Sequence, residues 1–326
     1  YAKRADLVTR SESMIQIMKN LKNGMHTLKR ETNTNIEKTV ELINKNAEKI
    51  SYLNTQIVKG EAGGSVANDL RDQRDLLIKE TASYIDLTSF EDDRGQITLL
   101  VAGGLPLVEG SIHQSLATEP RADNNGLSQV VYQNSQSTTI NINDRISGGK
   151  LGGYLKLRDE WVPRYEEQLN RLTASIITEV NLLHQNGTGL NGMTGLDYFN
   201  PLKIYSAKKD ESTGGALVTA SSVYDQSLLT QDRYEIRFTS AGNYDIVNTT
   251  DETVVSSGNA YTSGNAINFE GISITLTNST GTPQAGDVYY VDSFSNSINY
   301  LSLNSVVKSN VGAIGAGLST DQGDNK

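Results

Sequence analysis

The sequence predicts an α+β protein: an elongated multi-domain chain in which long helices form a rod-shaped bundle that carries small antiparallel β domains. Three observations support this prediction. The first sixty residues keep helical periodicity throughout, two further helical stretches follow, and the segments between and after them alternate between apolar and polar residues as strands do. The chain has 326 residues, which is enough for two or three domains.

The first stretch is predicted to be one long helix. Between Arg4 and Lys59 there is no proline and a single glycine, Gly24. A mostly apolar stripe recurs about every 3.6 residues, the period of an unstrained α-helix, at Met14, Met18, Leu21, Met25, Leu28, Thr32, Ile36, Val40, Ile43, Ala47, Ile50, Asn54 and Ile57. A helix that is apolar along one stripe needs other parts of the chain to cover that stripe. We expect the third helical stretch to lie along the first and cover it.

A second helix is predicted at residues 67–85, after a glycine-rich break that favours an antiparallel arrangement of the two helices. On this helix Arg71 is expected to pair with Asp75 at a spacing of four residues. The carboxylates of this stretch could also indicate a metal or acid–base site, but opposite charges interleaved at helical spacing favour an ion-pair network. Asp72, Arg74 and Asp75 are therefore structural candidates that fix the register of the helix.

A third helix is predicted at residues 149–186, and it opens on Ser-Gly-Gly-Lys. This motif is similar to the end of a phosphate-binding loop, but that loop has an earlier glycine and a Ser or Thr after the lysine, and both are missing here. Gly148, Gly149, Gly152 and Gly153 are instead structural candidates for a tight turn and close helix packing, where only glycine fits.

Pro163 lies within this third helix and should kink or restart it, because proline lacks a backbone donor and clashes with the preceding turn. The large apolar residues of the helix are expected to share one face. They are Leu151, Leu155, Val162, Tyr165, Leu169, Leu172, Ile176, Val180 and Leu183.

These patterns predict three domains. Residues 1–90, 147–190 and 300–326 are expected to form the helical rod domain. Residues 91–146 are expected to be a small β elaboration of the rod, and residues 197–297 a projecting β domain of sandwich or barrel type.

Charge and hydropathy argue against two classes of partner. The net charge is −9, with +5 on residues 1–60 (11 basic and 6 acidic side chains) and −7 on residues 187–326 (7 basic and 14 acidic). The basic side chains of the first helix are scattered, and no aromatic residues interleave with them, so nucleic acid is not an expected partner. No apolar run approaches the roughly 18 residues that a membrane helix needs, so no membrane partner is expected either.

No catalytic, cofactor-binding or metal site is predicted. The chain has no cysteine, which leaves no disulfide and no thiolate zinc site. His26, His113 and His184 are the only histidines, and none has a second ligand at metal-binding spacing, so each is expected to be a packing or surface residue. No nucleophile motif and no dinucleotide fingerprint occurs.

Several motifs occur together in one order. They are Glu-Leu-Ile-Asn at 41–44 with the segment 50–57, the charged segment 68–77, the glycine motif at 148–153 with Arg158 and Asp159, the set Asn181, His184, Gly187, Leu190, Gly192 and Phe199, and finally Gly323, Asp324 and Asn325. In order and spacing they resemble the family of flagellar hook-associated protein 1, strongly through residues 30–200 and weakly through 200–300. Ser51 stands where the family pattern leads us to expect alanine.

The resemblance implies a structural subunit of the bacterial flagellum that joins the hook to the filament, bears mechanical load, self-assembles and is not an enzyme. The implied partners are the hook protein, the second junction protein, further copies in a ring, and an export chaperone that binds a C-terminal helix missing from this chain. The protein would be secreted and extracellular, within the flagellum. The chain would be the central part of the protein, without both terminal helices.

Two other classes stay open. The acidic, tyrosine-containing segment 200–300 could make the 197–297 domain a surface adhesin or binding module for glycan or protein. Deleting only that segment separates this hypothesis from the junction hypothesis. An enzyme, such as a polysaccharide hydrolase, would need two carboxylates about 5–10 Å apart in a cleft, and the sequence marks no such pair.

Overall fold

The computed structural model describes residues 1–121, 124, 126–134 and 139–317. The chain divides into two compact units, each described here by itself: the first unit comprises residues 1–23 and those from 165 onward, and the second unit comprises residues 24–164. Both units combine helices with small antiparallel sheets, which confirms the α+β class. The elongated shape stays a prediction. So do the bounds of the three domains, which are 1–90 with 147–190 and 300–326 for the helical rod, 91–146 for its β elaboration and 197–297 for the projecting β domain.

Helix α1 runs from Ala2 to Glu61 without interruption, as the sequence predicts. Its stripe is buried in the core of the first unit at Met18 and in the core of the second at Ile36, Val40, Ile43, Ala47 and Ile50. Ile57 is also buried. Leu21 and Leu28 are 51% and 41% exposed. The expectation that the whole stripe is covered is therefore wrong at these two positions, which neither core of the described residues includes.

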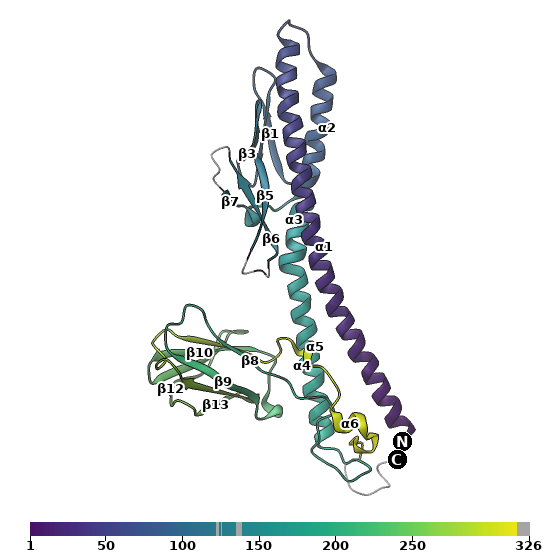
Figure 1. Cartoon of the computed structure of the whole chain (residues 1–326), viewed down its shortest axis with the longest axis vertical. Helices are drawn as coiled ribbons and strands as arrows, with labels where there is room; N and C mark the ends of the chain where they lie inside the picture. The colour runs from purple at the N-terminus through teal and green to yellow at the C-terminus, as the bar shows by residue number, and fades with distance from the viewer. Residues whose placement is uncertain (122–123, 125, 135–138, 318–326) are drawn as a thin grey trace. The chain divides into compact units, whose positions relative to one another are not determined.

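In the second unit, α2 (Asn68–Tyr84) lies beside α1, and two antiparallel sheets lie along the same stretch (Figure 1). One sheet has the order β1-β2-β3-β4 and the other the order β5-β6-β7. Their strands are β1 (Leu87–Glu91), β2 (Ile97–Val101), β3 (Leu105–Glu109), β4 (Ile112–His113), β5 (Ser115–Pro120), β6 (Ser128–Gln133) and β7 (Thr139–Asn141), with the 3₁₀ turn η2 (Asn143–Arg145) after them.

Strands, rather than the third helix, supply most of the cover for the α1 stripe in this unit. Leu99, Leu107 and Val130 belong to the same core as Ile43. Strand β2 buries every second side chain, so it presents one apolar face to that core, as its period predicts. From the third helical stretch only Leu151, Leu155 and the partly buried Tyr154 join in, so the expectation that this helix covers the stripe is largely wrong here.

The third helical stretch consists of three pieces, namely α3 (Gly149–Lys156), the π-helical η3 (Leu157–Trp161) and α4 (Val162–Gln185). The wide turn ends with the Val162 N–H bonded to the Leu157 carbonyl, five residues back. It comes directly before Pro163, whose ring would crowd the carbonyl of a regular α-turn. The helix does not restart at Pro163: it continues from Gly149 to Gln185, and the predicted irregularity takes the form of the π-helical turn.

The predicted apolar face of this stretch is wrong at three positions. Tyr165, Leu172 and Leu183 are each more than half exposed. Within the first unit, α4 buries Ala174 and Ile177 instead, together with polar side chains that bond to neighbouring backbone. The physical reason is that the sheets and loops cover a face of α4 made mostly of small and polar residues, and the positions of the large apolar residues do not indicate that face.

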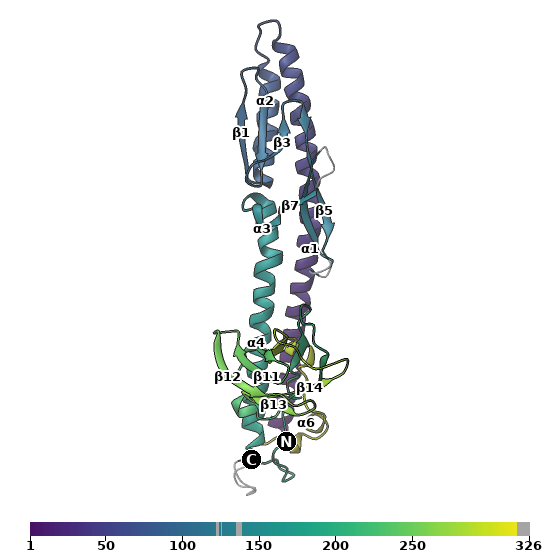
Figure 2. The same cartoon turned by 90° about the vertical axis from the view of Figure 1, so that its left-hand side faces the viewer.

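The first unit contains a sandwich of two antiparallel sheets, with strand orders β12-β11-β10-β15-β8 and β13-β14-β9 (Figure 2). Its strands are β8 (Tyr205–Lys208), β9 (Ala216–Val223), β10 (Arg233–Ser240), β11 (Asn243–Asn248), β12 (Thr253–Ala260), β13 (Ala266–Phe269), β14 (Ile272–Asn278) and β15 (Val288–Asp292). The sheets share one core, in which the rings of Tyr234 and Phe269 meet edge to face at 5.2 Å. The predicted small antiparallel β domain is confirmed.

The remaining elements of the first unit are short. They are η4 (Gln226–Leu228), α5 (Ser297–Tyr300), α6 (Ser305–Ser309) and η5 (Val311–Ala313). The motif at Gly323, Asp324 and Asn325 lies outside the described residues. None of the described helices combines the length and the apolar character that crossing a bilayer requires.

Candidate functional site: clamps between helices and sheets

Asparagine side chains on α1 hold the strands of the second unit by their backbone. Asn54 is fully buried; it donates from Nδ2 to the Ile97 carbonyl at 2.8 Å and accepts the Ile97 N–H at Oδ1 at 3.1 Å. The same Nδ2 donates to the Gly110 carbonyl at 2.7 Å. The two bonds to Ile97 imitate the pair that facing residues of two antiparallel strands exchange. One side chain thus ties both β2 and the turn after β3 to α1.

The same arrangement occurs at other positions. Asn44 exchanges both bonds with the backbone of Leu116 in β5, at 2.7 and 2.8 Å. Asn33 accepts the N–H of Ser128, the first residue of β6, at 2.9 Å. In the first unit, Asn181 of α4 exchanges both bonds with Phe199 at 3.0 and 2.8 Å. Because these bonds go to backbone, they fix the position of β5, β6 and the segment at Phe199 whatever the side chains there are.

A buried arginine completes the site at Asn54. Arg74 of α2 is 1% exposed and donates from Nη1 to Asn54 Oδ1 at 3.1 Å and to the Gly95 carbonyl at 2.6 Å. Its Nη2 lies 3.6 Å from a carboxylate oxygen of Glu91, and its Nε is a buried donor without a bond. Burial lowers the pKa of Arg74, while the carboxylates of Glu91 and Asp75 act in the opposite direction.

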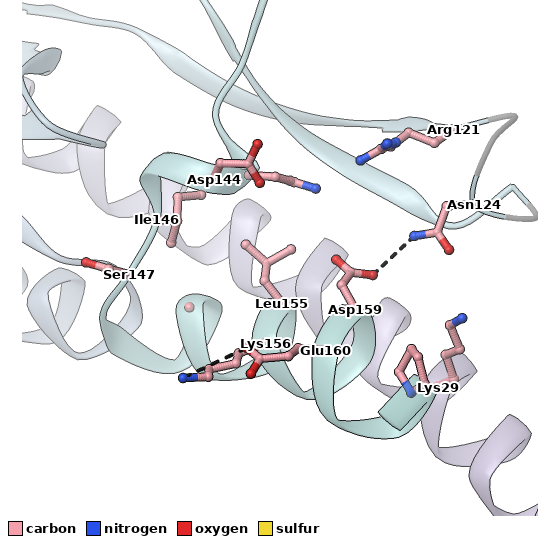
Figure 3. A pocket seen from close by; sticks show the side chains of 13 residues that line it. Lys29, Arg121, Asn124, Asp144, Ile146, Ser147, Leu155, Lys156, Asp159 and Glu160 are labelled. Carbon is pink, nitrogen blue, oxygen red and sulfur yellow. Dashed lines mark hydrogen bonds and ion pairs between the residues drawn. The ribbon is translucent and has the colours of Figure 1, made fainter. Parts of the chain in front are cut away.

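A second buried arginine repeats this plan at Asn33. Arg158, in the π-helical turn, donates from Nη1 to Asn33 Oδ1 and to the Ser128 carbonyl, each at 2.7 Å. Its Nε and Nη2 bind both oxygens of Asp159, at 2.9 and 2.7 Å. Figure 3 shows Asn124 reaching the same carboxylate, at 3.1 Å.

We call these two sites the Arg74 clamp (Asn54, Arg74, Gly95 and Ile97) and the Arg158 clamp (Asn33, Arg158 and Ser128). In each, one Nη1 atom is shared between an asparagine oxygen of α1 and a strand or turn carbonyl. Each therefore joins three segments that are far apart in sequence: α1, a second helical segment and a sheet. A buried guanidinium can do this because it presents several donors in one rigid plane.

Of the predicted carboxylates near Arg74, neither belongs to a clamp. Asp75 is largely exposed, 4.0 Å from Arg74 Nε, and Asp72 is exposed. The expected pair between Arg71 and Asp75 is wrong. Arg71 instead reaches across to the end of α1, where it binds both oxygens of Glu61 at 2.7 and 2.8 Å.

The Arg71 hydrogen bonds, together with the Ala67 N–H, lower the pKa of Glu61 to about 2. Arg71 also binds Glu91 of β1, so it bridges two helices and a strand. This bridge connects α1, α2 and β1, whereas an ion pair within α2 would connect no other segment.

The predicted glycines differ in what surrounds them. Gly149 has φ of +65°, and a Cβ there would lie 2.4 Å from the carbonyl carbon of Tyr84. A Cβ at Gly152 would lie 2.8 Å from the carbonyl carbon of Ser147, and one at Gly148 would lie 3.0 Å from Asp86 Cβ. Gly153 faces open space. Close packing therefore requires glycine at Gly149 and Gly152, and not at Gly153.

A polar cavity of about 590 Å³ adjoins the Arg158 clamp, between α1, the β5–β6 turn and the α3–η3 stretch (Figure 3). Its charged lining residues are Lys29, Arg121, Lys156, Asp144, Asp159 and Glu160. Asp159 already binds Arg158, and Glu160 lies 3.9 Å from Lys156. Two of the three carboxylates thus have cationic partners. No three His, Asp or Glu side chains converge as metal ligands in the part of the chain that the structure describes.

In the first unit, α4 is joined to the sandwich by an aromatic ring between two arginines. The guanidinium of Arg171 lies 4.2 Å from the centre of the Phe294 ring, and that of Arg233 lies 4.9 Å from it. Glu167 of α4 pairs with both arginines, at 3.2 and 3.1 Å. Arg233 also binds Asp292 at 2.9 Å. Glu167 and Asp292 reduce the repulsion between the two partly exposed cations that lie near one ring.

Sequence reasoning missed the asparagines. Asn54 lies inside the apolar stripe of α1, and a buried amide among apolar residues is a signal of a backbone contact that we did not use. Asn33 and Asn44 lie outside the stripe and gave no such signal. Arg158 and Asp159 were noted only as part of a family motif.

Comparisons with known proteins agree with this architecture. The family model described as the helical domain of flagellar hook-associated protein FlgK matches residues 1–199. Flagellar hook-associated protein 1 of Escherichia coli K12 is 27% identical over 304 residues, which are 91% of this chain and 54% of that protein. The same-named protein of Bacillus subtilis 168 is 28% identical over 240 residues, 66% of this chain and 46% of that protein.

A solved structure has the same fold: the flagellar hook junction protein FlgK from Burkholderia pseudomallei superposes with a TM-score of 0.65 at 22% identity, over 97% of this chain and 56% of that one. The chain spans about half the length of the curated relatives it matches. Since the family model covers more than half of its residues, the chain belongs to the family of flagellar hook-associated protein FlgK.

Proposed function

We propose that this chain is part of a structural subunit that joins the flagellar hook to the filament and transmits mechanical load between them. The observation that carries the proposal is the repeated clamp. In the second unit, both sheets are bonded to α1 through backbone groups, and two of the bonded positions are locked by buried arginines.

These attachments suit a subunit in which force acts on the sheets and must be passed to the long helix. A force on the β1–β4 sheet reaches α1 through the Asn54 bonds at Ile97 and Gly110, and a force on the β5–β7 sheet reaches it through bonds at Leu116 and Ser128. To separate the sheet from the helix, the force must break these bonds together and leave buried polar groups without partners, which costs roughly 1–3 kcal/mol for each group. In the first unit, Arg171 and Arg233 give the sandwich a comparable attachment to α4.

The proposal includes the partners and the location expected for the whole protein. These are the hook protein, the second junction protein, other copies in a ring, and an export chaperone that acts through a C-terminal helix. The protein would be secreted and would work extracellularly in the flagellum, without catalysis and without a cofactor. We also propose that Asp72 and Asp75 lie on the solvent-facing side of α2 and that Arg74 acts in the Arg74 clamp. Gly149 would allow α3 to pack closely against the end of α2, and Gly153 would face solvent.

The test uses the full-length protein in a bacterium that lacks its own copy. Asn54→Leu combined with Arg74→Leu removes one clamp, and Asn35→Leu combined with Arg164→Leu changes the same residue types at exposed sites. We expect both variants to be exported, and only the clamp variant to shed filaments when the cells swim in a viscous medium. Equal shedding by both variants, or normal filaments on a protein that lacks residues 1–326, would contradict the proposal.

Deleting only residues 197–297 tests the alternative of a surface binding module. The matched family is one of flagellar structural proteins, which favours the junction hypothesis. Intact assembly combined with lost adhesion would instead favour the binding module.

A further inference from the structure

His184 lies next to the last residue of α4 and joins three segments of the first unit. It is 6% exposed. Its Nδ1 lies 2.6 Å from the Leu196 carbonyl, and its Nε2 accepts the N–H of Gly315 at 3.0 Å. A carbonyl can only accept, so the proton sits on Nδ1 and the Nε2 lone pair faces Gly315. The imidazole is therefore bound as its neutral Nδ1–H tautomer.

Gly315 belongs to a segment, residues 311–317, that packs on the end of α4; we call it the latch segment. The Thr188 N–H donates to the Gly317 carbonyl at 2.7 Å, and Arg4 Nε donates to the Ile314 carbonyl at 3.3 Å. The segment approaches so closely that a Cβ at Gly187 would lie 2.9 Å from the carbonyl carbon of Gly315. Thr188 also accepts the N–H groups of Ala316 and Gly317, and the Asn191 N–H donates to the Gly312 carbonyl. Of the bonds that hold the latch segment, the one to His184 depends on a titratable group.

Release of the latch segment would uncover apolar surface. Ile314 is buried and, with Gly315, forms part of the wall of a groove of about 250 Å³. Leu7 and Met14 of α1 and Leu183 of α4 also line this groove. His184 also lines this groove, so protonation of its ring can alter access to the groove.

Protonation of His184 is incompatible with the bonds seen. A proton on Nε2 turns the acceptor of the Gly315 N–H into a second donor, so two N–H groups would face each other. Nδ1 remains a donor to Leu196 in both forms. Acid therefore removes the bond to the latch segment and keeps the bond to the loop at Leu196.

Several charged and titratable groups lie around the imidazole. From α1, Arg4 donates to the carbonyl of Ile314, next to Gly315. From the segment after α4, the Asp197 carboxylate accepts from Gln185 Nε2 at 2.7 Å. Tyr198 packs against the ring edge at 5.5 Å, with its hydroxyl 2.8 Å from that of Ser11. From α6, Lys308 is paired with Glu12 of α1 at 2.8 Å. These groups do not supply an acceptor for Nε2–H in the docked arrangement.

We propose that His184 is a pH-sensitive latch: at neutral pH it holds residues 311–317 on the end of α4, and protonation releases them. The released state binds the additional proton, so by linkage the docked population falls as the pH falls. The proposal concerns regulation of this helix end and stands apart from the junction role.

The test follows hydrogen exchange of the latch segment in the whole chain between about pH 8 and pH 5, the range in which histidines titrate. Exchange is corrected for the intrinsic pH dependence of amide exchange. The titration of His184 is followed by NMR of ¹⁵N-labelled imidazole in the same protein. We expect protection of the Gly315 amide to drop by about tenfold, the order expected for one hydrogen bond, with the same midpoint as the imidazole signal.

Two variants sharpen the test. His184→Gln keeps an acceptor near the Nε2 position but does not titrate, so protection should become independent of pH. His26→Gln removes an exposed histidine of the second unit and should leave the drop unchanged. Constant protection in the wild type, or a drop that persists in His184→Gln, overturns the proposal. If His184→Gln does not fold, the wild type alone tests the proposal: the midpoint of Gly315 amide protection must coincide with that of the imidazole NMR signal, and different midpoints overturn it.

Discussion

Arg158 Nη1 lies 2.7 Å from Asn33 Oδ1, although the two residues are 125 positions apart in the sequence. The same Nη1 binds the Ser128 carbonyl, and Ser128 returns its N–H to Asn33. A helix, a π-helical turn and a strand thus meet at one buried charge. Burying a charge costs free energy unless several partners surround it, so the Arg158 clamp tolerates few substitutions.

Replacing Arg158 by leucine should therefore destabilise the second unit by about 2–5 kcal/mol, at roughly 1–3 kcal/mol for each buried acceptor that loses its donor. The loss arises because Asn33 Oδ1 and the Ser128 carbonyl each lose a donor. Urea unfolding followed by circular dichroism measures it. Arg164→Leu, at an exposed position nearby, should change the free energy of unfolding by no more than about 0.5 kcal/mol. Equal effects of the two substitutions would argue against the clamp.

Replacing Asn54 by leucine keeps the volume approximately but removes the bonds to Ile97, Gly110 and Arg74. We expect a loss of about 3 kcal/mol or more, because several buried backbone groups are left unpaired. Hydrogen exchange should also show faster exchange at the Ile97 amide, which bonds to Asn54 Oδ1. The exposed Asn35→Leu is the matched control. An unchanged Ile97 amide in Asn54→Leu would show that the bond contributes little.

Alanine at two glycines of the same motif should have effects of opposite sign. Gly149→Ala places Cβ 2.4 Å from the Tyr84 carbonyl carbon at a positive φ, so we expect a loss of more than about 2 kcal/mol. Gly153→Ala points into open space within α3 and should stabilise by up to about 1 kcal/mol, because alanine loses less backbone entropy in a helix. Thermal unfolding midpoints measure both. A loss at Gly153 as large as that at Gly149 would contradict the packing described here.

Acid should weaken the sandwich of the first unit through Asp287. Burial acts to raise the pKa of Asp287, but N–H bonds from Gly214, Gln284 and Thr213, with the charge of Lys208, lower it below its usual value. A lowered pKa in the folded state means that the carboxylate stabilises the fold above its unfolded pKa of about 3.9. This stabilisation is lost as the pH falls through the folded value.

We therefore expect the free energy of unfolding to fall as the pH drops below about 4 and through the lower pKa of the folded state. Asp287→Asn should be less stable at pH 7 and show a smaller fall. Urea unfolding at a series of pH values measures this. The exposed Asp210→Asn should keep the wild-type slope. If Asp287→Asn showed the same pH dependence of the free energy of unfolding as the wild type, the loss of stability in acid would belong to other carboxylates.

The helices were the most predictable part of the fold. The period of the first sixty residues, the glycine break after them and Pro163 locate α1, α2 and the irregularity before α4, because helical hydrogen bonds join residues that are close in sequence. The period-two segments likewise predicted antiparallel sheets. Charged pairs were less predictable: Arg71 has Asp75 one turn away, yet binds Glu61 and Glu91.

What the sequence alone determined is the class of each segment and, through its motifs, the family resemblance. The tertiary structure decided the partners. It placed strands, and few side chains of the third helical stretch, on the buried stripe around Ile43, and it left Leu21 exposed. It also brought Asn33 to Ser128 and Arg158, and His184 to Gly315. The physical reason is that periodicity reports which face of a segment avoids water, whereas the identity of what covers that face depends on how distant segments meet.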